Sequence, residues 1–181
     1  MSVELFDVYD ENNKALGIVK PRSEVHRDGD WHRVVHIYVR NKDGQFLVHR
    51  RSPKKDLAAN TWDTRFGGHI QAGHDYDETV AREIEEEIGL KISINDLIVG
   101  GMRDYNGETN KEHAKFYFYY FNGDIKDLRF NDNEVMMVEW LTAREIRESM
   151  INKTREWAAS LEGFDFINDV AQKIKHENTI L

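Results

Sequence analysis

Residues 68–90 read GHIQAGHDYDETVAREIEEEIGL, and this stretch governs how the rest of the chain is interpreted. Its second part predicts a helix from Asp75 to Gly89. Asp75 followed by Glu78 has the form of a capping box, and a glycine commonly ends a helix. Apolar residues recur at four-residue spacing within it and are expected to face a core: Val80, Ile84 and Ile88. The acidic residues are thereby left to the other faces.

The predicted helix concentrates negative charge. Glu83 and Glu87 are one helical turn apart, Glu86 lies beside both, and Arg82 is the only basic residue among them. Like charges at this spacing destabilise a helix by about 0.2–0.5 kcal/mol per pair, so folding gives no reason to gather them. Magnesium prefers carboxylate oxygens and completes its shell with water and substrate phosphates. The pattern favours a divalent-metal site over a merely solvated acidic face.

The order of these residues resembles the Nudix box. That motif is a glycine, five residues, a glutamate, seven residues, and then Arg-Glu-apolar-any-Glu-Glu-any-Gly-apolar. One position departs from it, because His74 stands where the family has its first glutamate, a carboxylate that helps to orient the arginine. The positions that fit are Gly68, Arg82, Glu83, Ile84, Glu86, Glu87, Gly89 and Leu90. The departure bears on activity rather than on the fold.

The resemblance implies a fold and a chemistry. Nudix proteins are α/β/α sandwiches around a mixed sheet, and they typically use magnesium or manganese to cleave a nucleoside diphosphate linked to another moiety. Carried over by motif position, the metal ligands are Glu83, Glu86, Glu87 and the Gly68 carbonyl. Glu83 or Glu87 is the catalytic base, and Arg82 orients the glutamates. We therefore expect a metal-dependent hydrolase that cleaves a phosphoanhydride bond in a small diphosphate-containing molecule.

The flanking sequence predicts an α/β class and a single domain over residues 1–181. Strands are indicated on both sides of a turn at 10–13, on both sides of a turn at 41–44, and at 92–101, 116–121 and 135–141. The run FYFYYF at 116–121 is apolar on both faces, which predicts a central buried strand. Residues 23–33 are interpreted as a polar connection that follows Pro21 in a loop, and residues 142–176 as two amphipathic helices.

Composition excludes several functional classes. A chain of 181 residues with 40% hydrophobic residues can bury a core, and the absence of cysteine rules out disulfides and thiolate metal sites. The net charge of −8 argues against nucleic-acid binding, which needs a basic surface. No apolar run approaches the roughly 20 residues of a membrane helix, and the acidic start lacks the order of a signal peptide. We expect a cytoplasmic monomer or homodimer whose partner is a small-molecule diphosphate, without nucleic acid or membrane.

Three stretches outside the motif resemble one branch of the family: HRRSPKKD at 49–56, WDTRFGGHIQAG at 62–73 and NDNEVMMVEWL at 131–141. This branch contains isopentenyl-diphosphate isomerase and hydrolase-like relatives. The isomerase has a catalytic cysteine where this chain has Gly67, whereas Tyr105 and His69 fall at positions resembling its active-site residues. Arg51 and Tyr105 are the candidate substrate-binding residues. Glu134 is a candidate for an additional carboxylate near the site. Lys55 is one of several basic residues that could steer phosphates toward it.

Two alternative functions stay open. Because His74 replaces a carboxylate, the chain is alternatively a catalytically impaired diphosphate-binding module. Because Tyr105 and His69 fall at positions resembling isomerase active-site residues, the chain is alternatively an isoprenoid-diphosphate isomerase-like protein that lacks the cysteine.

The isomerase branch also implies a second metal site, rich in histidine. The positions here are His26, His32 and His69, with Glu112 at the start of the next strand. Imidazole nitrogens suit a transition metal or zinc better than magnesium. The ordinary alternative is that eight histidines in a chain of this size gather somewhere on its surface.

Overall fold

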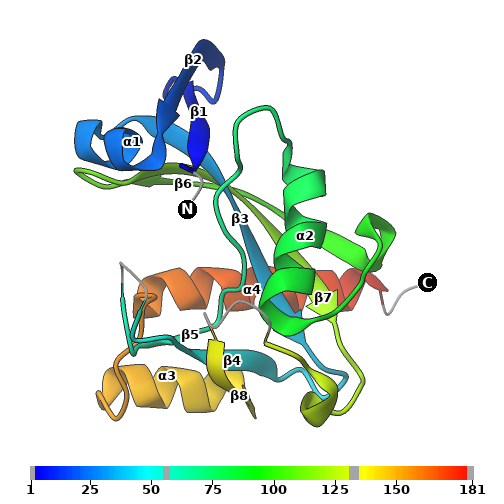
Figure 1. Cartoon of the computed structure of the whole chain (residues 1–181). Coiled ribbons are helices and arrows are strands. Elements are labelled where there is room, and N and C mark those ends of the chain that lie inside the picture. The colour runs from blue at the N-terminus through cyan, green and yellow to red at the C-terminus, as the bar shows by residue number, and fades with distance from the viewer. Residues whose placement is uncertain (1–2, 55–57, 131–134, 179–181) are drawn as a thin grey trace.

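The computed structural model describes residues 3–54, 58–130 and 135–178. Its strands are β1 (Leu5–Tyr9), β2 (Ala15–Pro21), β3 (Trp31–Arg40), β4 (Phe46–Arg51), β5 (Trp62–Asp63), β6 (Leu97–Asn106), β7 (Lys111–Tyr120) and β8 (Val135–Leu141). Its helices are α1 (Arg22–Asp28), α2 (Tyr76–Ile88), α3 (Ala143–Ile151) and α4 (Leu161–Asn178). Figure 1 shows how the helices are arranged around the strands.

The sheet is mixed, and β7 is an interior strand between β3 and β6. β7 pairs in parallel with β3, from Trp31 opposite Lys111 to Arg40 opposite Tyr120, and antiparallel with β6 on its other side. Tyr117 in the middle of β7 is fully buried. A strand with neighbours on both edges and covered faces has little polar surface to present, which explains its continuous apolar sequence.

β3 and β4 part soon after the turn that joins them. Their only register pair is Arg40 with Phe46. The segment after β4 lies between the two diverging strands: Trp62–Asp63 pairs with β4, whereas Phe66 and His69 form isolated bridges with β3. The loop that begins the acidic motif is therefore held in an extended form against the central sheet.

Helices cover both faces of the sheet, as Figure 1 shows for α2 and α4. Successive residues of a strand point to opposite faces. On β3, Val35, Ile37 and Val39 pack in a cluster with α2, whereas Tyr38 packs in a second cluster with α3 and α4. The predicted α/β/α sandwich around a mixed sheet is confirmed.

Three local predictions are wrong. Residues 23–33 are not a plain connection, because they include the helix α1 and the start of β3. The N-terminus of α1 has no side-chain cap at Pro21, whereas Gly29 ends the helix in the left-handed region and donates its N–H to the Val25 carbonyl; Val25 itself is buried against β1. Pro21 is the last residue of β2 rather than part of a loop. The strand expected from residue 92 begins at Leu97, after a 3₁₀ turn that Ser93 caps.

Among the described residues, no helix is long and apolar enough to cross a membrane.

Candidate active site

The acidic motif forms α2 with the ends that its sequence predicts. The Asp75 side chain accepts hydrogen bonds from the backbone N–H groups of Asp77 and Glu78, and the reciprocal bond of the capping box is present. Gly89 ends the helix in the left-handed region at φ 74°. A Cβ there would lie 2.7 Å from the Arg129 Cβ, so only glycine fits. The helix is thus fixed at both ends.

Two consecutive glycines bring the loop against the carboxylates of α2. The Gly67 N–H donates a 2.7 Å hydrogen bond to Oε2 of Glu87, whose residue is only 3% exposed. A Cβ on Gly68 would lie 2.6 Å from Oε2 of Glu83. A larger residue at position 68 would displace Glu83, so the motif glycine is needed for this close approach.

Arg82 lies among the glutamates that it was expected to orient. Its guanidinium is 2.9 Å from the Glu83 carboxylate and donates a 3.1 Å hydrogen bond to Glu86. His74 precedes α2, and its Nδ1 atom lies 3.2 Å from Oε2 of Glu78, which is on the exposed first turn of the helix. The arginine is therefore oriented by the metal-motif carboxylates themselves.

A cavity of about 440 Å³ opens beside these side chains. Arg82, Glu83 and Glu86 contribute to its lining together with Gly67 and Gly68. Its other polar lining residues include His69 and Glu112, and also Arg51, Asp63 and Arg65. Glu87 is not among the lining residues, because its carboxylate is turned to the backbone of the loop.

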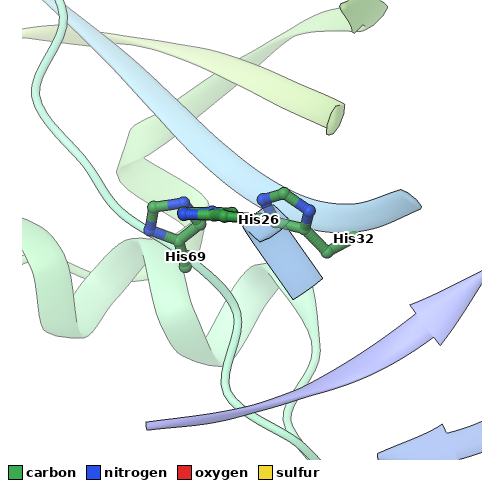
Figure 2. A group of neighbouring side chains, drawn as sticks. All are labelled: His26, His32 and His69. Atoms are coloured by element: carbon green, nitrogen blue, oxygen red, sulfur yellow. The ribbon is translucent and has the colours of Figure 1, made fainter. Parts of the chain in front are cut away.

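The three predicted histidines come together from three separate elements. Figure 2 shows the rings of His26, His32 and His69 side by side, from α1, β3 and the loop before α2. Their possible ligand atoms all lie within 4.8 Å of one another. The Nε2 atoms of all three are buried and, within the described part of the chain, have no hydrogen-bond partner. Phe6 stacks on His69 and His32 at ring distances of 4.9 and 5.5 Å and helps to hold them.

The environment keeps these imidazoles neutral. Burial is the largest cause lowering the pKa of His26, of His32 and, most strongly, of His69. The Nδ1 atom of His32 is 3.1 Å from the Asp30 carbonyl, which can only accept, so Nδ1 carries the proton and Nε2 has a lone pair. A neutral imidazole is the form that binds a metal, and in His32 the Asp30 carbonyl also fixes the tautomer.

A carboxylate lies at the edge of this cluster. Glu112 on β7 is opposite His32 on β3 in the parallel register. Its Oε1 atom is 4.0 Å from Nε2 of His69 and accepts a 2.8 Å hydrogen bond from Asn110. Three neutral nitrogens with one nearby carboxylate form a donor set that fits a transition metal or zinc.

The comparison with known proteins decides the family. A model of the NUDIX domain matches residues 30–161. The chain belongs to the Nudix family. An uncharacterised Nudix hydrolase of Clostridium acetobutylicum is 31% identical over 160 residues, which cover 84% of this chain and 77% of that protein. Nudix hydrolase 3 of Arabidopsis thaliana is 43% identical over 93 residues, which cover 51% of this chain but 12% of that protein. A crystal structure from Deinococcus radiodurans superposes with a TM-score of 0.70 at 25% identity and covers 94% of this chain and 98% of its own.

As a Nudix hydrolase, the chain acts on pyrophosphate bonds of phosphorus-containing compounds. Enzymes of this family generally act on nucleoside diphosphate derivatives and use divalent metal ions. The family and the fold predicted from the motif are confirmed. The resemblance to the isomerase branch stays a prediction.

The Nudix cavity includes one of the two predicted substrate-binding residues. Arg51 lines it, 3.8 Å from the Asp63 carboxylate. Tyr105 does not line it, but its ring contacts His36, a lining residue, at a ring distance of 5.7 Å. The candidates Glu134 and Lys55 lie outside the described residues.

Sequence reasoning missed the pair formed by Asp63 and Arg65. Asp63 is 1% exposed, and both of its carboxylate oxygens accept hydrogen bonds of 3.1 Å from the Arg65 guanidinium. The available signal was an acid and a base two residues apart, just before the double glycine.

Proposed function

We propose that this Nudix hydrolase cleaves a phosphoanhydride bond in a small diphosphate-containing molecule, a nucleoside diphosphate linked to a second moiety. The observation that carries the proposal is the contact of the glycine loop with the carboxylates of α2 at the wall of the cavity. Gly68 allows the Glu83 carboxylate to lie against the loop, and Gly67 donates to Glu87.

Glu83, Glu86 and Glu87 are the metal ligands in this proposal, together with the Gly68 carbonyl. That carbonyl accepts a 2.9 Å hydrogen bond from the Val35 N–H, and its second lone pair is suited to a cation. Mg²⁺ or Mn²⁺ suits this all-oxygen donor set. A bound cation supplies charge neutralisation of the diphosphate and a lowered pKa for the attacking water.

Glu83 is the better candidate for the base. It lines the cavity, whereas the Glu87 carboxylate is buried and accepts from the loop. The water oxygen forms the new bond to phosphorus while the bridging P–O bond breaks. One water proton passes to the Glu83 carboxylate, and the leaving phosphate takes the bonding electrons. Arg82 keeps Glu83 and Glu86 in place.

The geometry of the same site bears on the two alternative functions, an isomerase and a binding module. An isomerase of the related branch needs a cysteine at position 67, but a Cβ there would lie 2.2 Å from the Val35 carbonyl oxygen. The backbone of this chain therefore disfavours isomerisation. A binding module without catalysis is motivated by His74, yet Arg82 reaches two glutamates without a carboxylate at that position.

A panel of nucleoside diphosphate derivatives, dinucleoside polyphosphates and isoprenoid diphosphates, assayed with magnesium, tests the proposal. We expect hydrolysis of at least one nucleoside diphosphate derivative, abolished by EDTA and restored by Mg²⁺ or Mn²⁺. Tight binding without turnover of any compound would establish the binding module instead. Conversion of isopentenyl diphosphate to its allylic isomer at an enzymatic rate would establish the isomerase.

We also propose a second metal, a transition metal or zinc, at His26, His32 and His69, with Glu112 as an additional ligand. The specific support is the set of three buried Nε2 atoms that have no hydrogen-bond partner among the described residues. Leaving such atoms without a partner costs about 1–3 kcal/mol each. A bound ion removes that cost. Metal analysis of protein purified without a histidine tag tests it, and at least partial occupancy by one such metal is the expected result.

A further inference from the structure

Arg65 lies on the active-site cavity, next to the glycine loop. The bridges of Phe66 and His69 with β3 keep this segment extended. Phe66 and Ile70 are buried in the core with α2, and alternate side chains of an extended segment point to opposite sides. Arg65 and His69 therefore share the cavity side, where both are lining residues. Along the chain, Arg65 is two residues, or about 7 Å, from Gly67.

A buried carboxylate fixes the Arg65 guanidinium. Nε and Nη2 of Arg65 donate to the two oxygens of Asp63, whose side chain is 2% exposed. Burial raises the pKa of Asp63, but the charge and hydrogen bonds of Arg65, with smaller effects of His49 and Arg51, lower it below its usual value. Asp63 in turn is the largest cause raising the pKa of Arg65. The pair is ionised throughout the neutral range.

The pairing leaves part of the guanidinium available. Arg65 has five N–H donors, of which Asp63 accepts two. Within the described residues, the hydrogen bonds of the Arg65 side chain are those to Asp63, which leave the second N–H of Nη2 and both of Nη1 available. These groups form the end-on fork that matches the two oxygens of a phosphate or carboxylate. The Arg65 side chain is 24% exposed, although its partner is buried, so the open side of the pair faces the cavity.

A purely structural ion pair does not account for this arrangement. An ion pair that only stabilises the fold does not need to line the active-site cavity. It also does not need to keep unused N–H donors on the side that faces the cavity. The neighbouring His36 on the same wall is neutral, because burial and then Arg65 lower its pKa to about 3. Anchoring to Asp63 also removes much of the side-chain entropy that a free arginine would lose on binding.

We propose that Arg65, held by Asp63, binds an oxyanion of the substrate, a phosphate or carboxylate group on the moiety beyond the cleaved diphosphate. This inference rests on the proposed function and makes Arg65 a specificity-determining residue for it. A hydrocarbon moiety would desolvate the free donors of the guanidinium without replacing their water, so isoprenoid diphosphates are poor substrates.

Paired substrates test the proposal. One nucleoside diphosphate derivative carries a phosphate on its second moiety, another a carboxylate, and a third a hydroxyl at the same position. Arg65→Gln is expected to lower kcat/KM about 10- to 100-fold for a substrate with the oxyanion and by less than about threefold for the hydroxyl compound. The two charged substrates show which oxyanion the site prefers. Arg65→Lys, which keeps the charge but not the fork, should restore only part of the selectivity.

Two further variants keep the result interpretable. Asp63→Asn/Arg65→Gln removes both charges, so loss of selectivity in this variant is not caused by an unpaired buried carboxylate. Arg144→Gln removes a surface arginine that pairs with Glu148 on α3 and should change nothing. Equal effects of Arg65→Gln on all three substrates, or none on any, would overturn the proposal.

Binding experiments separate this inference from the proposed hydrolysis. Titration with inorganic phosphate and with succinate measures oxyanion binding, and titration with Mg²⁺ measures the metal site. Arg65→Gln should weaken oxyanion binding at least about tenfold and leave Mg²⁺ binding unchanged, and Glu87→Gln should do the reverse. That pattern in a protein without turnover would support the oxyanion site and reject the hydrolase. Turnover with unchanged oxyanion binding in Arg65→Gln would do the opposite.

Discussion

The carboxylates of α2 and the histidine cluster lie beside the same cavity but differ in how their polar atoms are satisfied. Glu83 and Glu86 are paired with Arg82, and Glu87 accepts from the loop. The three histidine Nε2 atoms, in contrast, are buried and have no hydrogen-bond partner within the described residues. We therefore expect the first group to be stable without an ion and to exchange partners when one binds. We expect the second group to gain hydrogen-bond or metal partners from a ligand.

This difference separates two roles for metal. Binding at α2 is expected to be weak, exchangeable and coupled to substrate, because protein groups compete with the cation and Mg²⁺ keeps part of its water. Binding at the histidines is expected to stabilise the fold, because the ion satisfies buried atoms that are otherwise unpaired. Substitutions at the two sites test this contrast.

Glu83→Gln and Glu87→Gln should each lower metal-dependent hydrolysis by about 10²- to 10⁴-fold, because each removes the negative charge of one proposed metal ligand. Glu83→Gln also removes the proposed base. Steady-state kinetics at saturating Mg²⁺ measure the loss. The matched control is Glu85→Gln, on the same helix but paired with Lys91 and outside the cavity lining. Wild-type turnover in both variants would show that the site is wrongly assigned.

His69→Ala should weaken binding of zinc at the histidine cluster at least about 100-fold, because a ligand contributes at least as much as the groups that orient it. Metal analysis and zinc titration of untagged protein provide the measurement. His74→Ala is the control, since His74 is an exposed histidine of the same loop. If the zinc affinity of both Glu87→Gln and His69→Ala equals that of the wild type, there is no separate histidine site.

Phe6→Leu should lower the free energy of unfolding by about 1–2 kcal/mol and weaken zinc binding several-fold, because Phe6 is fully buried and stacks on two of the imidazoles. Chemical denaturation with and without zinc measures both effects. Phe46→Leu is a matched control, because Phe46 is equally buried but packs in the cluster with α4. Equal zinc affinity in the two variants would mean that Phe6 does not position the histidines.

His74→Glu restores the family motif and should raise Mg²⁺ affinity a few-fold at α2 without affecting zinc at the histidines. The gain is small because Arg82 is already oriented by two glutamates, and because the new carboxylate lies near Glu78. Isothermal titration with Mg²⁺ compares it with His74→Gln. An unchanged or lower affinity would mean that neighbouring residues already replace the missing carboxylate.

The features that could be predicted from the sequence have local causes. The ends of α2 follow from Asp75, Glu78 and Gly89, which lie within or next to the helix. Its buried face follows from the spacing of Val80, Ile84 and Ile88. Caps and periodicity act within a few residues, so they can be read without knowing the rest of the fold. The motif order then identified the family.

The surroundings of that helix depend on contacts between distant segments of the folded chain. The parallel register of β3 with β7 places His32 opposite Glu112, and α1, which has no side-chain cap at its N-terminus, brings His26 to the same point. The separation of β3 from β4 makes room for the extended loop, which turns Arg65 toward the cavity beside a buried Asp63. These contacts join segments far apart in the chain, and their geometry depends on strand register and packing. No local pattern encodes register and packing, so the shared site of the histidines was predicted only through the family resemblance, and Arg65 was left unnoticed.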